Sequence, residues 1–160
     1  MTGKKAWVLA ILAIFSLSAC ATTQRAVKGA SLPNDIHIIA PSPDLRKDIA
    51  AFSGKWVGTL ESGMEIILVV AEIHDTWAQV FYSWGDNPQN SSMEAGHTHL
   101  RCKVISDPEP TIEYSGQQWE FNFVMKDLNT LGARGTFSWW RGGGADKQTS
   151  NFESSLKRAN

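Results

Sequence analysis

Apolar and polar residues alternate along most of the chain after residue 54. In residues 118–126 the odd positions hold Trp, Phe, Phe and Met, and nearly all of the even positions are polar. This period of two predicts a strand with one buried face. Similar segments, separated by turn-forming Gly, Pro, Asn and Asp, predict eight strands in all. They cover residues 55–62, 64–73, 77–84, 97–106, 111–114, 118–126, 133–141 and 150–158.

The spacing of these segments predicts the fold class. Strands of this length with no helices between them favour an all-β barrel or sandwich. Strands joined by sequential hairpins can also close on themselves, and closure removes both exposed edges of the sheet. We therefore predict a small eight-stranded antiparallel up-and-down barrel.

The alternation also assigns side chains to the interior of this barrel. Residues 66–71 are apolar on both faces, so the outer face of their strand needs a cover from the preceding chain. Residues 77–84 and 133–141 carry aromatic side chains on both faces. In the first of these strands we assign Val80, Tyr82 and Trp84 to the interior, and in the second we assign no inner face. The other interior assignments are Trp56, Gly58 and Leu60, then Leu100, Cys102 and Val104, then Trp119, Phe121, Phe123 and Met125, and finally Phe152, Ser154, Leu156 and Arg158.

A short helix is predicted before the first strand, over residues 44–52. Residues 42–44 are Ser-Pro-Asp, which supply a capping side chain, a proline for the first helical position and an acid for the first turn. Leu45, Ile49 and Phe52 then lie on one helical face, and Gly54 ends the helix.

The N-terminus has the layout of a secretory signal peptide. Lys4 and Lys5 precede an apolar run over residues 7–17, and small residues follow it. The run is shorter than the roughly 20 residues that span a bilayer as a helix. Residues 21–40 show little periodicity, so we interpret residues 20–40 as a tether and residues 41–160 as one domain.

Residues 17–20, Leu-Ser-Ala-Cys, resemble the lipobox of bacterial lipoproteins. The resemblance implies that residues 1–19 are removed and that Cys20 carries fatty-acyl chains such as palmitate, with the membrane as partner. Ala21 in place of an aspartate implies the outer membrane. Each buried methylene of an acyl chain contributes about 0.8 kcal/mol, so several chains hold a protein on a membrane stably. An ordinary signal peptide with an incidental Cys20 is the alternative.

Residues 52–56, Phe-Ser-Gly-Lys-Trp, resemble the start of the calycin barrels, which include lipocalins, fatty-acid-binding proteins and avidins. In lipocalins the Trp of Gly-x-Trp plugs one end of the barrel, and a basic residue at the close of the last strand packs across it. The resemblance implies that Gly54, Trp56 and Arg158 close the barrel in this way. The alternative is an unrelated eight-stranded domain with a buried tryptophan.

Composition gives no sign of a nucleic-acid partner. The chain has 15 Lys and Arg against 16 Asp and Glu, with a formal net charge of −1 at pH 7, and no basic stripe. Lipidation of Cys20 leaves Cys102 without a disulfide partner. We expect Cys102 to be a buried, inert thiol.

Groups that could carry catalysis or bind a metal remain incomplete. His97 and His99 share one face of a strand, which is a partial zinc or copper site, but Arg101 and Lys103 share that face and oppose a bound cation. We assign no metal and no cofactor. No Gly-x-Ser-x-Gly motif is present, so no catalytic residue is assigned and an enzyme stays open as a third hypothesis.

Aromatic residues supply the main indication of function. An eight-stranded barrel is either filled by side chains or holds one small ligand. The first hypothesis is non-catalytic binding of a small apolar or amphipathic ligand inside the barrel, with residues 85–96 as a lid or binding edge. The alternative is a fully packed barrel that serves as a structural or interaction module of the cell envelope, with no particular protein partner indicated. The candidate ligand-binding residues are Tyr82, Trp84, Tyr114, Trp119, Phe121 and Phe123.

Overall fold

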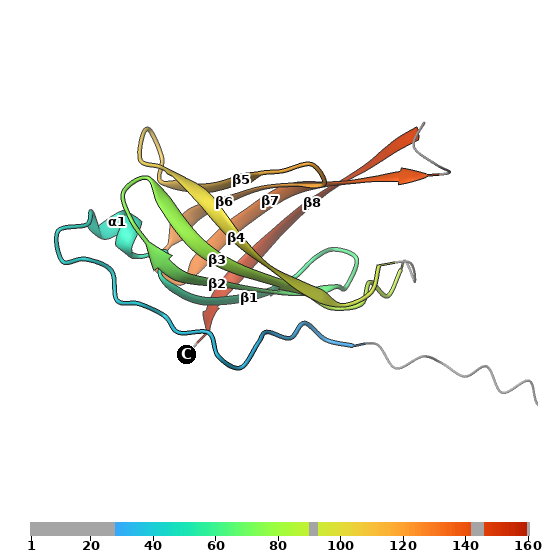
Figure 1. Cartoon of the computed structure of the whole chain (residues 1–160), viewed down its shortest axis with the longest axis horizontal. Coiled ribbons are helices and arrows are strands. Elements are labelled where there is room, and N and C mark those ends of the chain that lie inside the picture. The colour runs from blue at the N-terminus through green and yellow to red at the C-terminus, as the bar shows by residue number, and fades with distance from the viewer. Residues whose placement is uncertain (1–27, 90–92, 142–145, 160) are drawn as a thin grey trace, which may run out of the picture.

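Eight antiparallel strands form a closed barrel, in which each strand pairs with its neighbour in the sequence and the last returns to the first (Figure 1). The computed structural model describes residues 28–89, 93–141 and 146–159, so the signal peptide and Cys20 lie outside the described residues. The predicted all-β up-and-down barrel with a short preceding helix is confirmed. The elements are α1 (Lys47–Ala50), β1 (Gly54–Thr59), β2 (Glu65–Ile73), β3 (Trp77–Trp84), β4 (Gly96–Ile105), β5 (Thr111–Ser115), β6 (Trp119–Asp127), β7 (Thr130–Arg141) and β8 (Asp146–Ala159).

The core follows the alternation of the sequence. Val80 and Tyr82 lie in the interior, so the assignment in the ambiguous third strand is confirmed. In β7, the other ambiguous strand, Leu131 and Ala133 face inward. The core also contains Trp56, Leu60, Ile66, Leu68, Val70, Cys102, Val104, Ile112, Phe121, Phe123 and Leu156.

The hairpin of β7 and β8 is longer than predicted. Its register runs without a break from Thr130 opposite Lys157 to Arg141 opposite Asp146. Residues 146–149 are all polar, and their strand conformation comes from hydrogen bonding to β7 rather than from an apolar face. A pattern search along the sequence therefore misses the start of β8.

The predicted helix start at Ser42 is wrong. The Ser42 carbonyl accepts a hydrogen bond from the Leu45 amide at 3.0 Å, and its hydroxyl accepts one from the Asp44 amide at 3.3 Å. These bonds close a turn, which competes with the helix for the same backbone groups. Helix α1 begins only at Lys47 and has no side-chain cap. The predicted apolar face is nevertheless present, since Ile49 and Phe52 are buried in the core.

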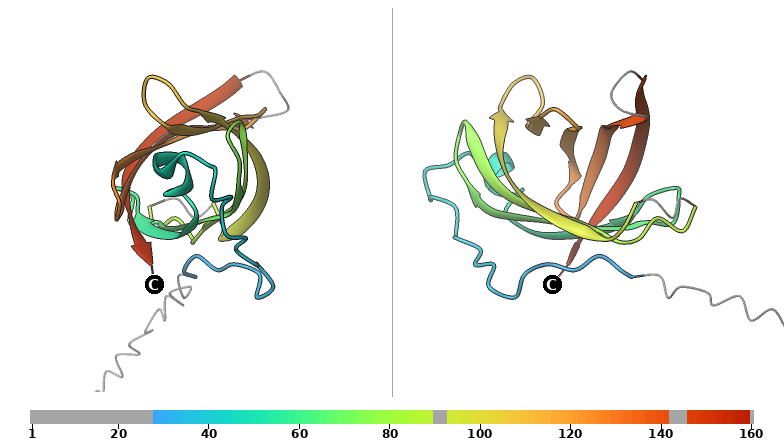
Figure 2. Two further views of the ribbon diagram at one scale, coloured as in Figure 1. Left: turned by 90° about the vertical axis from the view of Figure 1, so that its left-hand side faces the viewer. Right: turned by 45° about the vertical axis from the view of Figure 1, so that its right-hand side comes forward.

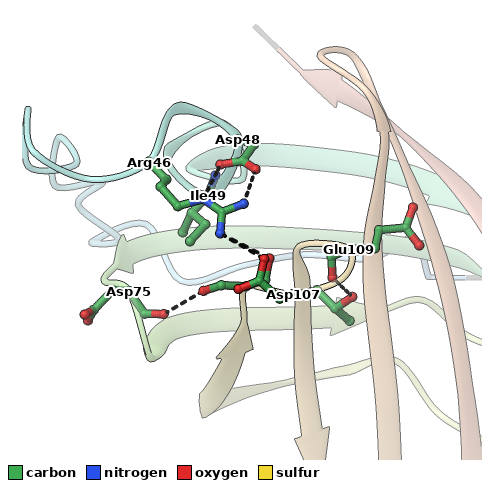
Figure 3. Close-up of polar contacts among 8 residues, drawn as sticks. Arg46, Asp48, Ile49, Asp75, Asp107 and Glu109 are labelled. Atoms are coloured by element: carbon green, nitrogen blue, oxygen red, sulfur yellow. Dashed lines mark hydrogen bonds and ion pairs between the residues drawn. The ribbon is translucent and has the colours of Figure 1, made fainter.

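Helix α1 lies across one end of the barrel, which we call the closed end (Figure 2). Burial of Ile49 and Phe52 holds it there, and the Trp56 indole donates a hydrogen bond to the Phe52 carbonyl at 2.9 Å. Arg46 adds a link to the β4–β5 turn (Figure 3). Its guanidinium pairs with Asp48 at 2.7 Å and donates to the Ser106 carbonyl at 3.3 Å. These exposed polar contacts orient the helix more than they stabilise it.

Residues 28–40, which the sequence assigned to the tether, run along the outside of the barrel beside β2 and β3 (Figure 1). The Ile39 amide donates to the Ala71 carbonyl at 2.7 Å, and the Ser83 hydroxyl donates to the Ser31 carbonyl at 2.7 Å. Val69, Ala71 and Ser83 face outward and are nevertheless buried. This segment therefore supplies the cover that the apolar outer face of β2 requires. Within the described residues, no helix is long and apolar enough to cross a membrane.

Candidate ligand-binding cleft at the open end of the barrel

The barrel is closed tightly near α1 and opens toward its other end. The seam between β1 and β8 pairs only Lys55–Val57 with residues 157–159, and the seam between β4 and β5 pairs only residues 103–105 with residues 111–113. All of these residues lie near the closed end. Farther along, strands β1–β4 and strands β5–β8 diverge, as Figures 1 and 2 show. We call this second end the open end.

The divergence leaves a cleft of about 1220 Å³ at the open end. Its lining comes from the β1–β2 turn, the end of β3, the β3–β4 loop and residues on both faces of β6, β7 and β8. This volume is somewhat above the roughly 300–1,000 Å³ of pockets that bury a small organic ligand, so the cleft has room for one. The apolar lining residues are Leu60, Met64, Tyr82, Trp84, Met93, Trp119, Phe137 and Phe152.

Aromatic rings in mutual contact form the floor of this cleft. The ring centroids of Trp84 and Trp119 are 5.3 Å apart, and those of Trp119 and Phe137 are 4.2 Å apart. Tyr82 lies against both tryptophans, at 5.9 and 6.3 Å. The floor is therefore one continuous aromatic surface contributed by β3, β6 and β7.

The six candidate ligand-binding residues divide into two layers. Tyr82, Trp84 and Trp119 line the cleft. Tyr114, Phe121 and Phe123 lie outside its lining and pack below it, with Phe121 stacked on Tyr114 at 5.6 Å and against Tyr82 at 4.9 Å. Phe121 supports the floor through its contact with Tyr82, and Tyr114 and Phe123 pack against Phe121.

Sequence reasoning missed several lining residues. Phe152 had been assigned to the interior but not to a ligand site, and Phe137 lies in the strand whose inner face could not be chosen. Met64 follows the β1–β2 turn and Met93 lies in the β3–β4 loop, where no periodicity identifies the inner side. Only the approach of these segments in three dimensions brings them to one cleft.

Tyr82 carries a buried polar atom that no described residue satisfies. Its side chain is 1% exposed, and its hydroxyl has no hydrogen-bond partner among the described residues. Burial raises the pKa of this hydroxyl well above its ordinary value. Buried polar groups are nearly always paired, so an orphan hydroxyl below a cleft calls for an explanation.

The β3–β4 loop forms one edge of the cleft, as its length suggested. Asn87, Gln89, Met93 and Glu94 line the opening. Hydrogen bonds brace the base of the loop, where the Asp86 carboxylate accepts the Ala95 amide at 2.7 Å. The same carboxylate accepts the Lys28 amide at 2.9 Å, which ties the N-terminal segment to the loop.

Further hydrogen bonds hold the remainder of this loop against the floor. The Asn87 amide donates to the Met93 carbonyl at 3.1 Å, and the Trp84 indole donates to the Glu94 carbonyl at 2.9 Å. The loop is therefore positioned by the floor that it borders.

The charged residues of the lining are mostly acidic. The described lining holds four glutamates and one arginine, with no lysine or histidine. Arg134 pairs with Glu153 at 3.1 Å, and both occupy outward positions of β7 and β8. Glu61 in the β1–β2 turn and Glu94 in the β3–β4 loop lie at the mouth. We call Glu61 and Glu94 the mouth carboxylates.

The closed end is sealed by the residues that the sequence singled out. The guanidinium carbon of Arg158 lies 4.0 Å from the Trp56 ring centroid, and Trp56 is fully buried. The same guanidinium donates hydrogen bonds to the carbonyls of Ala51, Ser53 and Leu128. The contact therefore joins the first strand, the last strand and the α1 segment, and a cation over an indole face contributes about 0.5–1 kcal/mol.

Gly54 is required at this closed end for two reasons. Its φ angle is +122°, a conformation that side chains with a Cβ rarely adopt. A Cβ built at this position would also lie 2.9 Å from Nη1 of Arg158. The glycine therefore allows the backbone to approach the arginine.

The other reactive groups considered in the sequence do not form a site. His99 lies on the outer face, where it stacks on Phe81 at 4.3 Å and contacts Gln79. The described residues contain no group of three side chains placed to hold a metal ion. Cys102 is buried, and burial raises its pKa to about 12, so the thiol is not a nucleophile near neutral pH.

No protein-family model matches the chain, and no curated protein matches it significantly. The fold and the cleft define a barrel that is sealed at one end and open at the other, with an aromatic floor.

Proposed function

We propose that this protein is a lipid-anchored binding protein whose barrel holds a small apolar or amphipathic ligand in the cleft at its open end. The observation that carries the proposal is the asymmetry of the barrel. One end is sealed by α1, Trp56 and Arg158, while the other has a cleft of about 1220 Å³ over an aromatic floor. A fully packed interaction module has no need of such a cleft.

The apolar lining supports a ligand that is at least partly apolar. Rings, methionines and Leu60 supply the apolar part of the lining, and burial of apolar ligand surface against them contributes roughly 25 cal/mol per Å² before the costs of binding. The polar atoms at the mouth suit a ligand with one polar end.

The proposed anchor lies close to the open end. Lys28 is held at Asp86, at the base of the β3–β4 loop, and this loop borders the cleft. Cys20 precedes Lys28 by eight residues, and an extended segment of that length spans at most about 28 Å. Lipidation of Cys20, which we propose from its lipobox, would therefore keep the mouth of the cleft within reach of the membrane surface.

Native mass spectrometry tests the binding function directly. Residues 20–160 are purified with Cys20→Ser, so that no attached acyl chain competes for the cleft. A stoichiometric small-molecule adduct is expected, or a mass gain on incubation with lipids. Trp119→Ala, which removes part of the floor, abolishes the adduct. A barrel that stays free of ligand with every lipid offered would refute the proposal.

The matched control is Trp77→Ala. Trp77 lies on the outer face, where it stacks with His74 at 4.1 Å and contacts Arg101. The change removes the same side chain from the same barrel but leaves the cleft lining intact, so the adduct is retained. Loss of the adduct in both variants would show that the Trp119 result reflects general destabilisation.

The anchor is tested separately. The full-length chain is expressed in bacteria supplied with a labelled fatty acid. The label is expected on the protein and is expected to be lost in Cys20→Ser. An unlabelled wild-type chain would contradict the anchor without touching the binding function.

A further inference from the structure

The cleft has features that select among amphipathic ligands by their charge. Trp84 and Trp119 line the cleft and are only half-buried. An aromatic face carries negative electrostatic potential, so it attracts a cation and repels an anion. Indole faces are the strongest of the natural rings in this respect.

The charged groups of the lining also favour a cation over an anion. Arg134 is the single cationic side chain among the described lining residues, and Glu153 already pairs with it on the outward side of the wall. A carboxylate or phosphate ligand would therefore find no unpaired basic group among these residues. The mouth carboxylates, Glu61 and Glu94, would in addition repel an anion and attract a cation as either approaches.

The buried hydroxyl of Tyr82 supplies a specific polar contact. A phenol oxygen accepts a hydrogen bond as well as donating one, and this oxygen has neither contact among the described residues. Trp84 and Trp119 both lie against Tyr82. Because the hydroxyl is buried, a ligand reaches it only by moving one of these rings aside.

We propose that the cleft binds an amphipathic organic cation, a protonated amine with an apolar body. Its ammonium group displaces one of the two indoles, lies against the other and donates a hydrogen bond to the Tyr82 oxygen, and its apolar body lies along Leu60, Met64 and Phe152. The tryptophans are half-buried, so the ammonium group keeps part of its hydration. This inference rests on the proposed binding function and adds the class of ligand.

The first test compares head groups on one alkyl chain. Dodecylammonium, dodecyltrimethylammonium and dodecanoate are titrated below their micelle concentrations at pH 7 into residues 20–160 carrying Cys20→Ser. Calorimetry gives the affinity, and tryptophan fluorescence reports movement of Trp84 or Trp119. Dodecylammonium is expected to bind about tenfold more tightly than dodecanoate. Salt is expected to narrow this difference, because it screens the mouth carboxylates.

The second test separates the hydrogen bond from the charge. The trimethylammonium group has no N–H, so it is expected to bind several-fold more weakly than the primary ammonium in the wild-type protein. Tyr82→Phe removes the acceptor and is expected to abolish that difference. Tyr114→Phe is the matched control, because Tyr114 is the only other tyrosine of the chain and lies outside the cleft lining.

The third test concerns the mouth carboxylates. The double variant Glu61→Gln with Glu94→Gln is expected to weaken dodecylammonium binding and to reduce its dependence on salt. Glu109→Gln is the control, because Glu109 lies in the β4–β5 turn at the closed end (Figure 3).

The outcomes distinguish this inference from the function on which it rests. Dodecanoate that binds as tightly as dodecylammonium overturns the cation proposal and leaves the binding function standing. Unchanged head-group preference in Tyr82→Phe overturns the role of the hydroxyl. No binding of any probe, together with a ligand-free mass, overturns the binding function itself.

Discussion

Most substitutions in a protein core lower the free energy of unfolding, but the orphan hydroxyl of Tyr82 predicts an increase on its removal. Removing the oxygen by Tyr82→Phe should stabilise the ligand-free barrel. A buried polar group without a partner costs about 1–3 kcal/mol relative to its hydrated state in the unfolded chain. The Tyr82 side chain is 1% exposed and its hydroxyl is unpaired among the described residues, so this cost applies.

The magnitude follows from what the substitution keeps and what it removes. Phenylalanine keeps the ring and therefore its contacts with Phe121 at 4.9 Å and with Trp84 at 5.9 Å. It leaves a space the size of one oxygen atom, which offsets part of the gain. We expect a net stabilisation of about 1 kcal/mol, which raises the melting temperature of a domain of this size by about 3–5 °C.

Urea unfolding measured by circular dichroism gives the free energy of unfolding for the wild type and for Tyr82→Phe. Tyr114→Phe is measured beside them and is expected to change stability little, since the Tyr114 side chain is not fully buried. A loss of 1 kcal/mol or more in Tyr82→Phe would show that the hydroxyl makes a favourable contact in the ligand-free protein. The reasoning that assigns its partner to a ligand would then fail.

Three further predictions concern the remainder of the barrel. Arg158→Ala should lower the free energy of unfolding by about 2–4 kcal/mol in urea titrations, since three carbonyls and the Trp56 face lose their partner, whereas Arg134→Ala on the outer face should change it little. The pKa of Cys102 is about 12 in the folded protein and 9.0 ordinarily, so the thiol of the unfolded chain loses its proton at lower pH than that of the folded chain. The contribution of the thiol to stability is therefore complete below pH 9 and is lost as the pH rises toward 12. Cys102→Ala should therefore show a shallower loss of stability than the wild type between pH 9 and pH 11, and equal slopes would contradict the buried thiol. A chain that begins at residue 41 should melt at a lower temperature than one that begins at residue 28, because Val69 and Ala71 lose their cover; equal melting temperatures would argue against docking of the segment.

Much of the fold is present in the local pattern of the sequence. Alternation with a period of two assigned Trp119, Phe121 and Phe123 to the interior, and the structure places them there. The same pattern predicted the eight sequential strands, because the pleat of a strand alternates its side chains whatever its neighbours are. The apolar outer face of residues 66–71 even predicted that another segment must cover β2.

The local pattern fails where a contact competes with it. Ser42 resembles a helix cap, but its own hydroxyl and carbonyl close a turn, and α1 begins only at Lys47. The first residues of β8 resemble a loop, and pairing with β7 makes them a strand. In both cases hydrogen bonds determine the local structure. These bonds join groups whose relative position the helix or strand propensity of single residues does not specify.

The candidate site depends most on the tertiary structure. The sequence by itself assigned Tyr82, Trp84 and Trp119 to the interior, but it left the inner face of the strand that holds Phe137 unassigned. Only the folded chain decided that the β1–β8 and β4–β5 seams are short, that the barrel opens beyond them, and that Met64 and Met93 meet at the opening. The folded chain also decided that the Tyr82 hydroxyl is buried without a hydrogen-bond partner among the described residues. The physical reason is that strand formation depends on residues two positions apart, whereas a seam, a cleft and an unpaired polar atom depend on which distant strands meet and where they separate.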